Sequence, residues 1–239
     1  MKSFVQIKEE PYILWEDDRY LACWKPNNLL VHRTNFDFGE KESLRNYLID
    51  TLGKAHAPLH RLDKPTSGVV LFAKDKEAFK YVQEQFVGNS IEKEYVAIVR
   101  GFVTEEGVID KPLSGSDGGE AKASETRYAP LATVELDIPV SRYASARYSL
   151  VKVSPKTGRY HQIRMHFSHF RHPVIGDRRH GDVKHNKMWE SEFGIRSMFL
   201  HANILKFKHI NGELISVKAP FPELWKLVSR KFSWDEFIY

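Results

Sequence analysis

The chain has 239 residues, 42% of them hydrophobic, 28% charged, and a net charge of +5, which suits a folded core and excludes disordered and fibrous classes. It carries one cysteine, so a disulfide framework and a thiolate metal cage are excluded and a reducing compartment is the expected location. No apolar run approaches the ~20 residues of a membrane span, and the N-terminus lacks the apolar region of a signal peptide, so we expect a cytoplasmic protein with no membrane partner.

The first half of the chain alternates short strands with amphipathic helices. In chain order we expect a hairpin over 12–26, a helix over 42–53, a strand over 68–75, a helix over 76–87 and a strand over 93–101. Gly53 is a natural helix stop, and Asp75 can accept the first backbone N–H groups of the second helix. Phe79, Val82 and Phe86 form the predicted apolar stripe of that helix.

The second half is richer in strands. A glycine- and serine-rich stretch over 113–124 predicts a mobile surface loop, followed by a strand over 146–155 and a turn entering a helix over 158–170. Asn211-Gly212 predicts a hairpin over 204–220, and a terminal helix is expected over 221–230. Strands outnumber helices and hairpins dominate the connections, so the predicted class is α+β with a mixed, mostly antiparallel sheet.

Positive charge is concentrated in one segment. Between Lys152 and Lys208 there are 12 lysines and arginines against 4 acidic residues, and seven of the 11 histidines. A solvated basic face and a phosphate-binding surface both fit this segment, and the clustering favours the second. His161, His166, His169 and His172 could also hold a metal, but cations surround them and no cysteine lies nearby. We therefore favour pairing with phosphates or core carbonyls and expect no metal.

Asp63 stands out within the stretch "HRLDKPTSG", where it lies between Arg61 and Lys64. One reading is a loop carboxylate that caps a turn or pairs with Arg61 at the surface, and such surface pairs contribute little energy. The other is a carboxylate kept ionised by adjacent cations, available as a nucleophile or a base. Pro65 biases Lys64 towards an extended conformation and so stiffens the loop. The residues alone leave both readings open.

Five stretches, in order, resemble the motifs of the RluA-type pseudouridine synthases. They are "HRLDKPTSGVVLFAKD", "KEYVAIVRG", "KTGRYHQIRMHF", "HPVIGDRRHGD" and "FLHANILKF", with "VHR" near the start. The early "KPNN" departs from the usual Lys-Pro-x-Gly, because Asn28 replaces the glycine. Asparagine tolerates positive φ, so we expect this turn to survive. A second departure, His209-Ile210, lies after the last motif.

The resemblance implies a pseudouridine synthase fold, with the sheet in two halves and a central active-site cleft. It implies a single catalytic domain over 1–239 without a separate N-terminal RNA-binding domain. The reaction isomerises uridine in RNA: the N1–C1′ bond breaks, the uracil turns and a C5–C1′ bond forms. Nothing is oxidised or consumed, so no cofactor is expected, in agreement with the lack of phosphate-loop and dinucleotide motifs. We expect a monomer with no obligate protein partner.

The same resemblance assigns roles to individual residues. Asp63 matches the catalytic nucleophile, with attack on the base and on the sugar both open. Arg164 matches the arginine that pairs with this aspartate, and Tyr95 matches the active-site tyrosine that stacks on uracil. Arg61 matches the arginine that helps extrude the target nucleotide. His60 is expected to support the loop without taking part in the chemistry.

The substrate follows from the branch of the family that the run of motifs resembles most. That branch implies tRNA as the partner, with uridine 65 of the T-stem as the target. Two alternatives stay open: the same chemistry on ribosomal RNA, and a catalytically silent RNA-binding relative. The presence of Asp63, Tyr95 and Arg164 argues against the silent relative.

Overall fold

The computed structural model describes most of the chain. The described residues are 7–32, 42–115 and 118–239. Part of the "VHR" match, at Arg33, and part of the predicted glycine- and serine-rich loop, at 116–117, lie outside the described residues.

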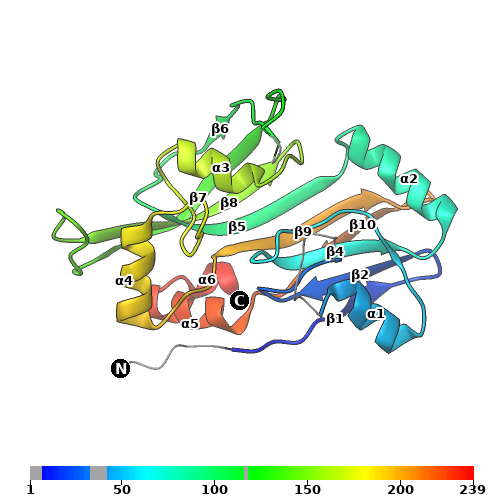
Figure 1. The fold of residues 1–239 in the computed structure, drawn as a ribbon, viewed down its shortest axis with the longest axis horizontal. Coiled ribbons are helices and arrows are strands. Elements are labelled where there is room, and N and C mark those ends of the chain that lie inside the picture. Colours follow the sequence, from blue (N-terminus) through cyan, green and yellow to red (C-terminus); the bar gives the residue numbers. More distant parts are fainter. Residues whose placement is uncertain (1–6, 33–41, 116–117) are drawn as a thin grey trace. The chain divides into compact units, whose positions relative to one another are not determined.

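The chain divides into two compact units (Figure 1). The Asp63 unit is Glu9–Lys93 together with Ala202–Pro222. The Arg164 unit is built mainly from Glu94–His201 and Glu223–Tyr239. Each unit therefore combines segments that are distant in sequence, and each carries part of the predicted site.

The Asp63 unit is a layer of mostly antiparallel strands with two helices. Its strands are β1 (Tyr12–Glu16), β2 (Tyr20–Lys25), β3 (Ala57–Pro58), β4 (Ser67–Ala73), most of β9 (Leu200–Lys208) and β10 (Leu214–Lys218). The spatial order is β1-β2-β4-β9, with β3 beside β4 and β10 beside β9. The hairpins predicted over 12–26 and 204–220 are both confirmed. Every residue of β2 and β4 is buried, which explains why their sequences are continuous apolar runs.

The two helices of this unit are α1 (Leu44–Leu52) and α2 (Lys76–Val87). Helix α2 has the predicted bounds, whereas α1 begins two residues later than predicted, with Ser43 as its N-cap. Gly53 ends α1 in the left-handed region at φ 70°, and Asp75 accepts the backbone N–H of Ala78 at 3.0 Å. The predicted apolar stripe of α2 is only partly right. Val82 is buried, but Phe79 and Phe86 are half-buried, and Ala78 takes the second fully buried position.

The Arg164 unit contains a second antiparallel layer. Its elements are β5 (Glu92–Arg100), which begins just before the unit, β6 (Gly107–Ile109), β7 (Thr126–Leu136), β8 (Ala146–Pro155), α3 (Gln162–His169), α4 (Val183–Phe193), α5 (Glu223–Phe232) and α6 (Asp235–Ile238). The spatial order is β5-β8-β7-β6. Helix α3 packs against β7 and β8 (Figure 1).

Two apolar clusters support this unit. The first joins the strands to α3 through Val99, Val151 and Phe167 among others. The second is aromatic and joins α4 to α5, with ring centroids of Trp189 and Phe232 5.7 Å apart. Aromatic pairs of this geometry add about 1 kcal/mol each beyond the area they bury. Helix α4, which sequence analysis did not predict, is therefore held by packing.

The α+β class and the mostly antiparallel sheet are confirmed. A central cleft stays a prediction. Within the described ranges, no helix is both long and apolar enough to cross a bilayer. Cys23, the single cysteine, is buried in β2, and burial, with a smaller effect of Glu16, raises the pKa of its thiol to about 12.

Candidate active site

The loop that carries Asp63 is held by its main chain. The Thr66 N–H donates to the Asp63 carbonyl at 3.0 Å and closes a turn. The Lys25 Nζ donates to the Lys64 carbonyl at 3.1 Å, and the Asn27 Nδ2 donates to the Pro65 carbonyl at 2.6 Å. Three successive carbonyls of the loop are thus bonded, so the backbone from which the Asp63 side chain projects is fixed. The stiffening of the loop by Pro65 itself stays a prediction.

Lys25 is the centre of this arrangement. Its side chain is fully buried, and its Nζ also donates to the carbonyls of Pro26 at 3.0 Å and Leu29 at 2.8 Å. Burial lowers the pKa of Lys25 to about 7, the nearby Asp63 carboxylate opposes this shift, and Lys64 adds to it. Lys25 therefore links the turn after β2 to the Asp63 loop and lies within electrostatic reach of the Asp63 carboxylate. This role of Lys25 was not among the predictions, in which "KPNN" entered only through the departure at Asn28.

Asn28 takes the conformation that the family's glycine would take. Its φ is 64°, in the left-handed region that asparagine tolerates. The prediction that this turn survives is confirmed. The turn matters because it carries Asn27 and follows Lys25, both of which hold the Asp63 loop.

The entry of the loop into β4 depends on one glycine. Gly68 has φ 121°, and a Cβ there would lie 2.2 Å from the main-chain oxygen of Ala202. Only glycine fits such a close approach between backbones. Gly68 also lies opposite Lys25 in the β2–β4 register. Gly68 of the first motif is therefore needed for the Asp63 loop to enter β4 opposite Lys25.

His60 fixes the other side of the loop. Its Nε2 accepts the backbone N–H of Leu71 at 3.0 Å, so the proton of the neutral ring lies on Nδ1. Burial, and then the charge of Lys93, lower the pKa of His60 to about 3. The ring is neutral at pH 7 and holds the loop to β4, as predicted.

Arg61 does not form the surface ion pair that one reading of the sequence required. Its side chain is exposed, and it has no ion pair or hydrogen bond within the part of the chain that the structure describes. The reading in which Asp63 simply pairs with Arg61 is therefore wrong. An exposed arginine beside the loop remains available to a ligand.

Arg164, in the other unit, is held through its side chain. It is 5% exposed and lies on α3, where its Nε and Nη2 donate to the two carboxylate oxygens of Asp177 at 2.7 and 2.8 Å. This is a bidentate pair, the geometry that fixes a guanidinium plane most strongly. The resemblance implied Asp63 as the partner of Arg164, and the predicted site residues did not include Asp177. The pairing of Asp63 with Arg164 stays a prediction.

Asp177 is kept charged although it is only 1% exposed. Burial alone would raise the pKa of Asp177, but the hydrogen bonds and charge of Arg164 outweigh it, together with the backbone N–H groups of His180 and Arg179. The net pKa is lowered, so the pair is ionised at neutral pH. A buried, ionised pair of this kind orients the guanidinium rather than adding much stability.

A glycine and an asparagine hold Asp177 in place. Gly176 has φ 79°, and a Cβ there would lie 1.9 Å from the Ser197 carbonyl oxygen. The Asn186 side chain, from α4, accepts the Gly176 N–H at 2.8 Å and donates to the Asp177 carbonyl at 2.9 Å. The "IGD" within the fourth quoted motif is therefore held in a fixed conformation. This Gly-Asp dipeptide was the signal that could have marked Asp177 as a site residue, although not as the partner of Arg164.

The start of α3 is fixed by a buried glutamine. The Gln162 Nε2 donates to the Glu125 carbonyl at 2.9 Å and to the Thr126 hydroxyl at 3.0 Å, while its Oε1 accepts the Thr157 hydroxyl at 2.7 Å. In the "HQIR" run, Gln162 therefore lies two positions before Arg164 and carries these hydrogen bonds. This network positions the first turn of the helix from which Arg164 projects.

Tyr95 lies on β5 opposite Val153, in the Arg164 unit. Its ring is half-buried and packs on the apolar cluster around Val151 and Phe167. The structure thus gives Tyr95 a rigid base in the core of this unit. Its proposed contact with uracil stays a prediction.

Several histidines of the basic segment hydrogen-bond to main-chain carbonyls. His166 contacts the Lys111 carbonyl and the Thr126 hydroxyl, each at 2.9 Å, and His172 contacts the Arg100 carbonyl at 2.8 Å. The reading in which these two histidines pair with carbonyls is confirmed. Among the described residues, no group of three histidine, cysteine or acidic side chains is arranged to hold a metal ion.

Comparison with known proteins identifies the class to which this fold and these motifs belong. The family model for RNA pseudouridylate synthase matches residues 19–169, so the chain belongs to that family. A protein of Vibrio parahaemolyticus named tRNA pseudouridine synthase C is 41% identical over 236 residues, which cover 94% of this chain and 96% of that protein. The protein of the same name from Haemophilus influenzae is 38% identical over 93% of this chain and 98% of its own length.

Solved structures show the same fold. Human RNA Pseudouridylate Synthase Domain Containing 1 superposes with a TM-score of 0.72 at 27% identity, covering 92% of this chain and 86% of that one. Human RNA Pseudouridylate Synthase Domain Containing 4 gives a TM-score of 0.71 over 92% of each chain at 24% identity, and at this identity the likeness concerns the fold alone. The fold predicted from the motif order is confirmed.

Proposed function

We propose that this protein isomerises uridine to pseudouridine in tRNA, at uridine 65 of the T-stem. The observation that carries the proposal is a 41% identity, along 94% of the chain, with a protein named tRNA pseudouridine synthase C. The geometry agrees, because the loop around Asp63 is anchored at three successive carbonyls.

Asp63 is the proposed nucleophile. A nucleophilic carboxylate must be ionised and must be presented from a backbone that does not move, because a misplacement of 1 Å can cost about 100-fold in rate. The anchored turn supplies that backbone. In the reaction the N1–C1′ bond breaks and a C5–C1′ bond forms, while the C5 proton is lost and N1 gains one. No oxidant or reductant is needed.

Arg164 is proposed to keep Asp63 charged and oriented, with Asp177 as the residue that positions Arg164. The two carboxylate oxygens of Asp177 bind Nε and Nη2, which sets the direction of the remaining nitrogen, Nη1. A guanidinium that is already paired and oriented stabilises a nearby anion without reorganising. The role of Asp177 is thus exerted through Arg164.

Arg61 and Tyr95 are proposed to handle the target nucleotide. A base inside an RNA duplex is inaccessible to an enzyme, so it must be flipped out and the gap filled. The exposed guanidinium of Arg61, beside Asp63 on the loop, suits that task. Tyr95, held on the core of its unit, would stack on the uracil and assist removal of the C5 proton.

Recognition of tRNA is proposed to rely on shape and phosphates. The deep, narrow major groove of an RNA duplex hides the base edges, so a protein reads its backbone and 2′-hydroxyls. The excess of positive charge between Lys152 and Lys208 suits that mode. We also propose that the two units act as one catalytic domain, and that the protein works as a monomer in the cytoplasm. Light scattering at assay concentrations checks the monomer.

The direct test is Asp63→Asn, which keeps the shape and removes the charge. We expect pseudouridine formation in a tRNA transcript to fall by about 10⁴-fold or more, with tRNA binding nearly unchanged. Glu135→Gln, an exposed carboxylate of the Arg164 unit, is the matched control and should keep full activity. Full activity of the Asp63 variant would overturn the assignment of the nucleophile.

The substrate is tested by mapping pseudouridines with carbodiimide in RNA from a strain that lacks the protein. We expect one pseudouridine of the tRNA T-stem to disappear. Loss of a ribosomal pseudouridine with every tRNA pseudouridine retained would instead assign the same chemistry to ribosomal RNA. Loss of none, together with RNA binding, would indicate a silent relative.

A further inference from the structure

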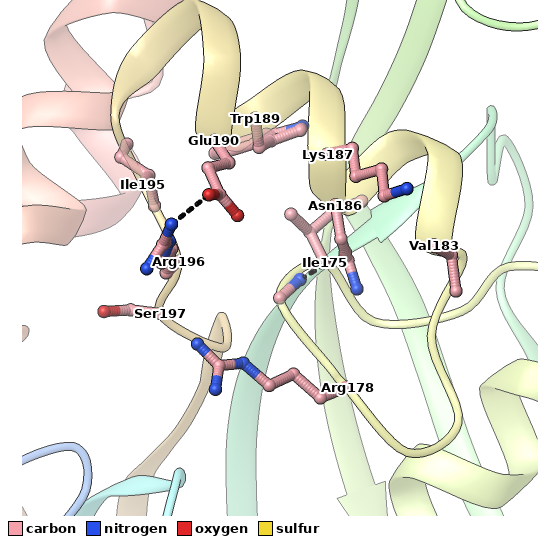
Figure 2. Close-up of a pocket in the computed structure, with 11 residues that line it drawn as sticks. Ile175, Arg178, Val183, Asn186, Lys187, Trp189, Glu190, Ile195, Arg196 and Ser197 are labelled. Atoms are coloured by element: carbon pink, nitrogen blue, oxygen red, sulfur yellow. Dashed lines mark hydrogen bonds and ion pairs between the residues drawn. The ribbon is translucent and has the colours of Figure 1, made fainter. Parts of the chain in front are cut away.

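The Arg164 unit contains a hollow that the proposed chemistry does not use. It has a volume of about 230 Å³ and lies between α4 and the segments around Gly176 and Ser197 (Figure 2). The polar side chains that line it are Arg178, Asn186, Lys187, Glu190, Arg196 and Ser197. All belong to one unit, so the hollow is a feature of that unit alone.

Positive charge predominates in this lining. Arg196 forms an ion pair with Glu190, shown by the dashed line in Figure 2. Arg178 and Lys187 are exposed, and neither has an ion pair or hydrogen bond with any residue that the structure describes. Figure 2 shows the Arg178 side chain lying along one side of the hollow with its guanidinium towards Ser197. Two cations that no carboxylate neutralises thus line a concave surface.

The walls of the hollow are rigid. Gly176 is in the left-handed region, and a Cβ there would lie 1.9 Å from the Ser197 carbonyl oxygen, so the two backbone segments are closely packed. Asn186 bonds to both Gly176 and Asp177 and joins the loop to α4. Trp189, at 1% exposure, forms an apolar base. A preformed site loses little conformational entropy when it binds a ligand.

Charge and size together indicate the chemistry of the ligand. Guanidinium groups bind phosphate oxygens through paired N–H donors, and an unneutralised arginine in a concave site is the usual arrangement for that purpose. Sites for whole small molecules have volumes of roughly 300–1,000 Å³, so 230 Å³ is small for a free cofactor. The hollow suits one phosphate and its adjoining sugar within a longer strand.

We propose that this hollow binds a backbone phosphate of the RNA substrate, with Arg178 as its main contact and Lys187 at its rim. The proposal rests on the proposed function in taking RNA as the ligand. Arg178 directly follows Asp177, whose carboxylate orients Arg164. A phosphate held here is therefore bound by the same loop that positions the arginine of the candidate active site.

The test measures binding of an unmodified tRNA transcript at several KCl concentrations. Each phosphate contact contributes about 0.7–0.9 to the slope of log K against log salt. Arg178→Gln should lower the slope by about one contact, and the double variant Arg178→Gln/Lys187→Gln by about two. Arg230→Gln, an exposed arginine on α5 outside the hollow, is the matched control and should keep the wild-type slope. Glu190→Gln releases Arg196 from its pair and should tighten binding.

Unchanged slopes in both hollow variants would overturn the proposal. A free ligand is a separate outcome: competition by inorganic phosphate or uridine 5′-monophosphate at millimolar concentrations, lost in Arg178→Gln, would show a mononucleotide site and also overturn it. Binding is measured without catalysis, so the two proposals can fail independently. Wild-type protein that forms no pseudouridine but shows the Arg178-dependent slope would refute the activity and support the RNA site.

Discussion

The two units hold their key charged residues by opposite means. In the Asp63 unit the bonds that fix the loop go to main-chain carbonyls, from Lys25, Asn27 and Thr66. In the Arg164 unit the bonds go to the side chain itself, from both oxygens of Asp177. The difference suits two tasks, because a nucleophile needs a fixed base from which to react, whereas an electrostatic partner needs a fixed direction.

The largest loss of stability is expected at the Arg164–Asp177 pair, where hydrogen bonds hold the arginine side chain itself. Asp177→Ala removes the carboxylate that compensates the buried Arg164 charge, and loss of one partner of a buried pair costs about 4 kcal/mol. Urea denaturation should show this loss in the free energy of unfolding. The exposed pair of Arg147 and Glu135 provides the comparison, since Glu135→Gln should cost less than about 1 kcal/mol. Equal costs for the two variants would contradict the contrast between the units.

The second-largest effect is expected from a steric clash between residue 68 and the backbone of Ala202. Gly68→Ala places a Cβ 2.2 Å from the Ala202 oxygen and strains a positive φ, so we expect a loss of about 3 kcal/mol and displacement of the Asp63 loop. Gly53→Ala is the matched control, because its φ is also positive but nothing lies within 4 Å of the new Cβ. Its cost should be about 1 kcal/mol, from the left-handed conformation alone. Thermal unfolding of both variants measures the difference.

The smallest of the three effects concerns Lys25. Near pH 9 the neutral amine of Lys25 has two N–H donors for its buried carbonyl acceptors, and Lys25→Met removes both donors. The substitution should lower the free energy of unfolding by about 2 kcal/mol at that pH. The pKa of Lys25 is about 7 in the folded protein and near its ordinary value of 10.5 when unfolded. Between these values the unfolded chain binds a proton that the folded chain does not, so this residue makes stability rise with pH.

The measurement for Lys25 is the unfolding free energy at pH 7, 8 and 9. The free energy of unfolding should rise less over this pH range in Lys25→Met than in the wild-type protein. Below pH 7 the folded protein bears the full cost of burying the Lys25 charge. Lys80→Met, at an exposed position on α2, should leave the rise unchanged. An identical pH dependence in all three proteins would show that Lys25 is not the titrating group.

Much of the fold could be predicted from local sequence. Asn211-Gly212 predicted the hairpin of β9 and β10, Asp75 predicted the start of α2, and Gly53 predicted the end of α1. Each of these features depends only on neighbouring residues. Helix α4 was missed, since its stability comes from contacts of Trp189 and Phe193 with the distant Phe232 rather than from an apolar stripe.

The candidate site divides in the same way. Asp63, Arg61 and His60 lie within one motif and could be identified there. Asp177 could not be assigned to Arg164, because the contact depends on how the loop after α3 turns back, which Gly176 and Asn186 decide in three dimensions. Lys25 was missed for a similar reason, since its contact with the Lys64 carbonyl becomes visible only when β2 and β4 are paired.

Cys23 gives the chain a built-in chemical reporter. The Cys23 thiol is buried in β2, between β1 and β4, and burial keeps it protonated at neutral pH. Alkylating reagents therefore cannot reach the sulfur, and the sulfur is not present as the reactive thiolate. Labelling must therefore wait for that part of the sheet to open. Because the chain has a single cysteine, the rate of one modification, followed by mass spectrometry, reports how often the layer that carries the Asp63 loop comes apart.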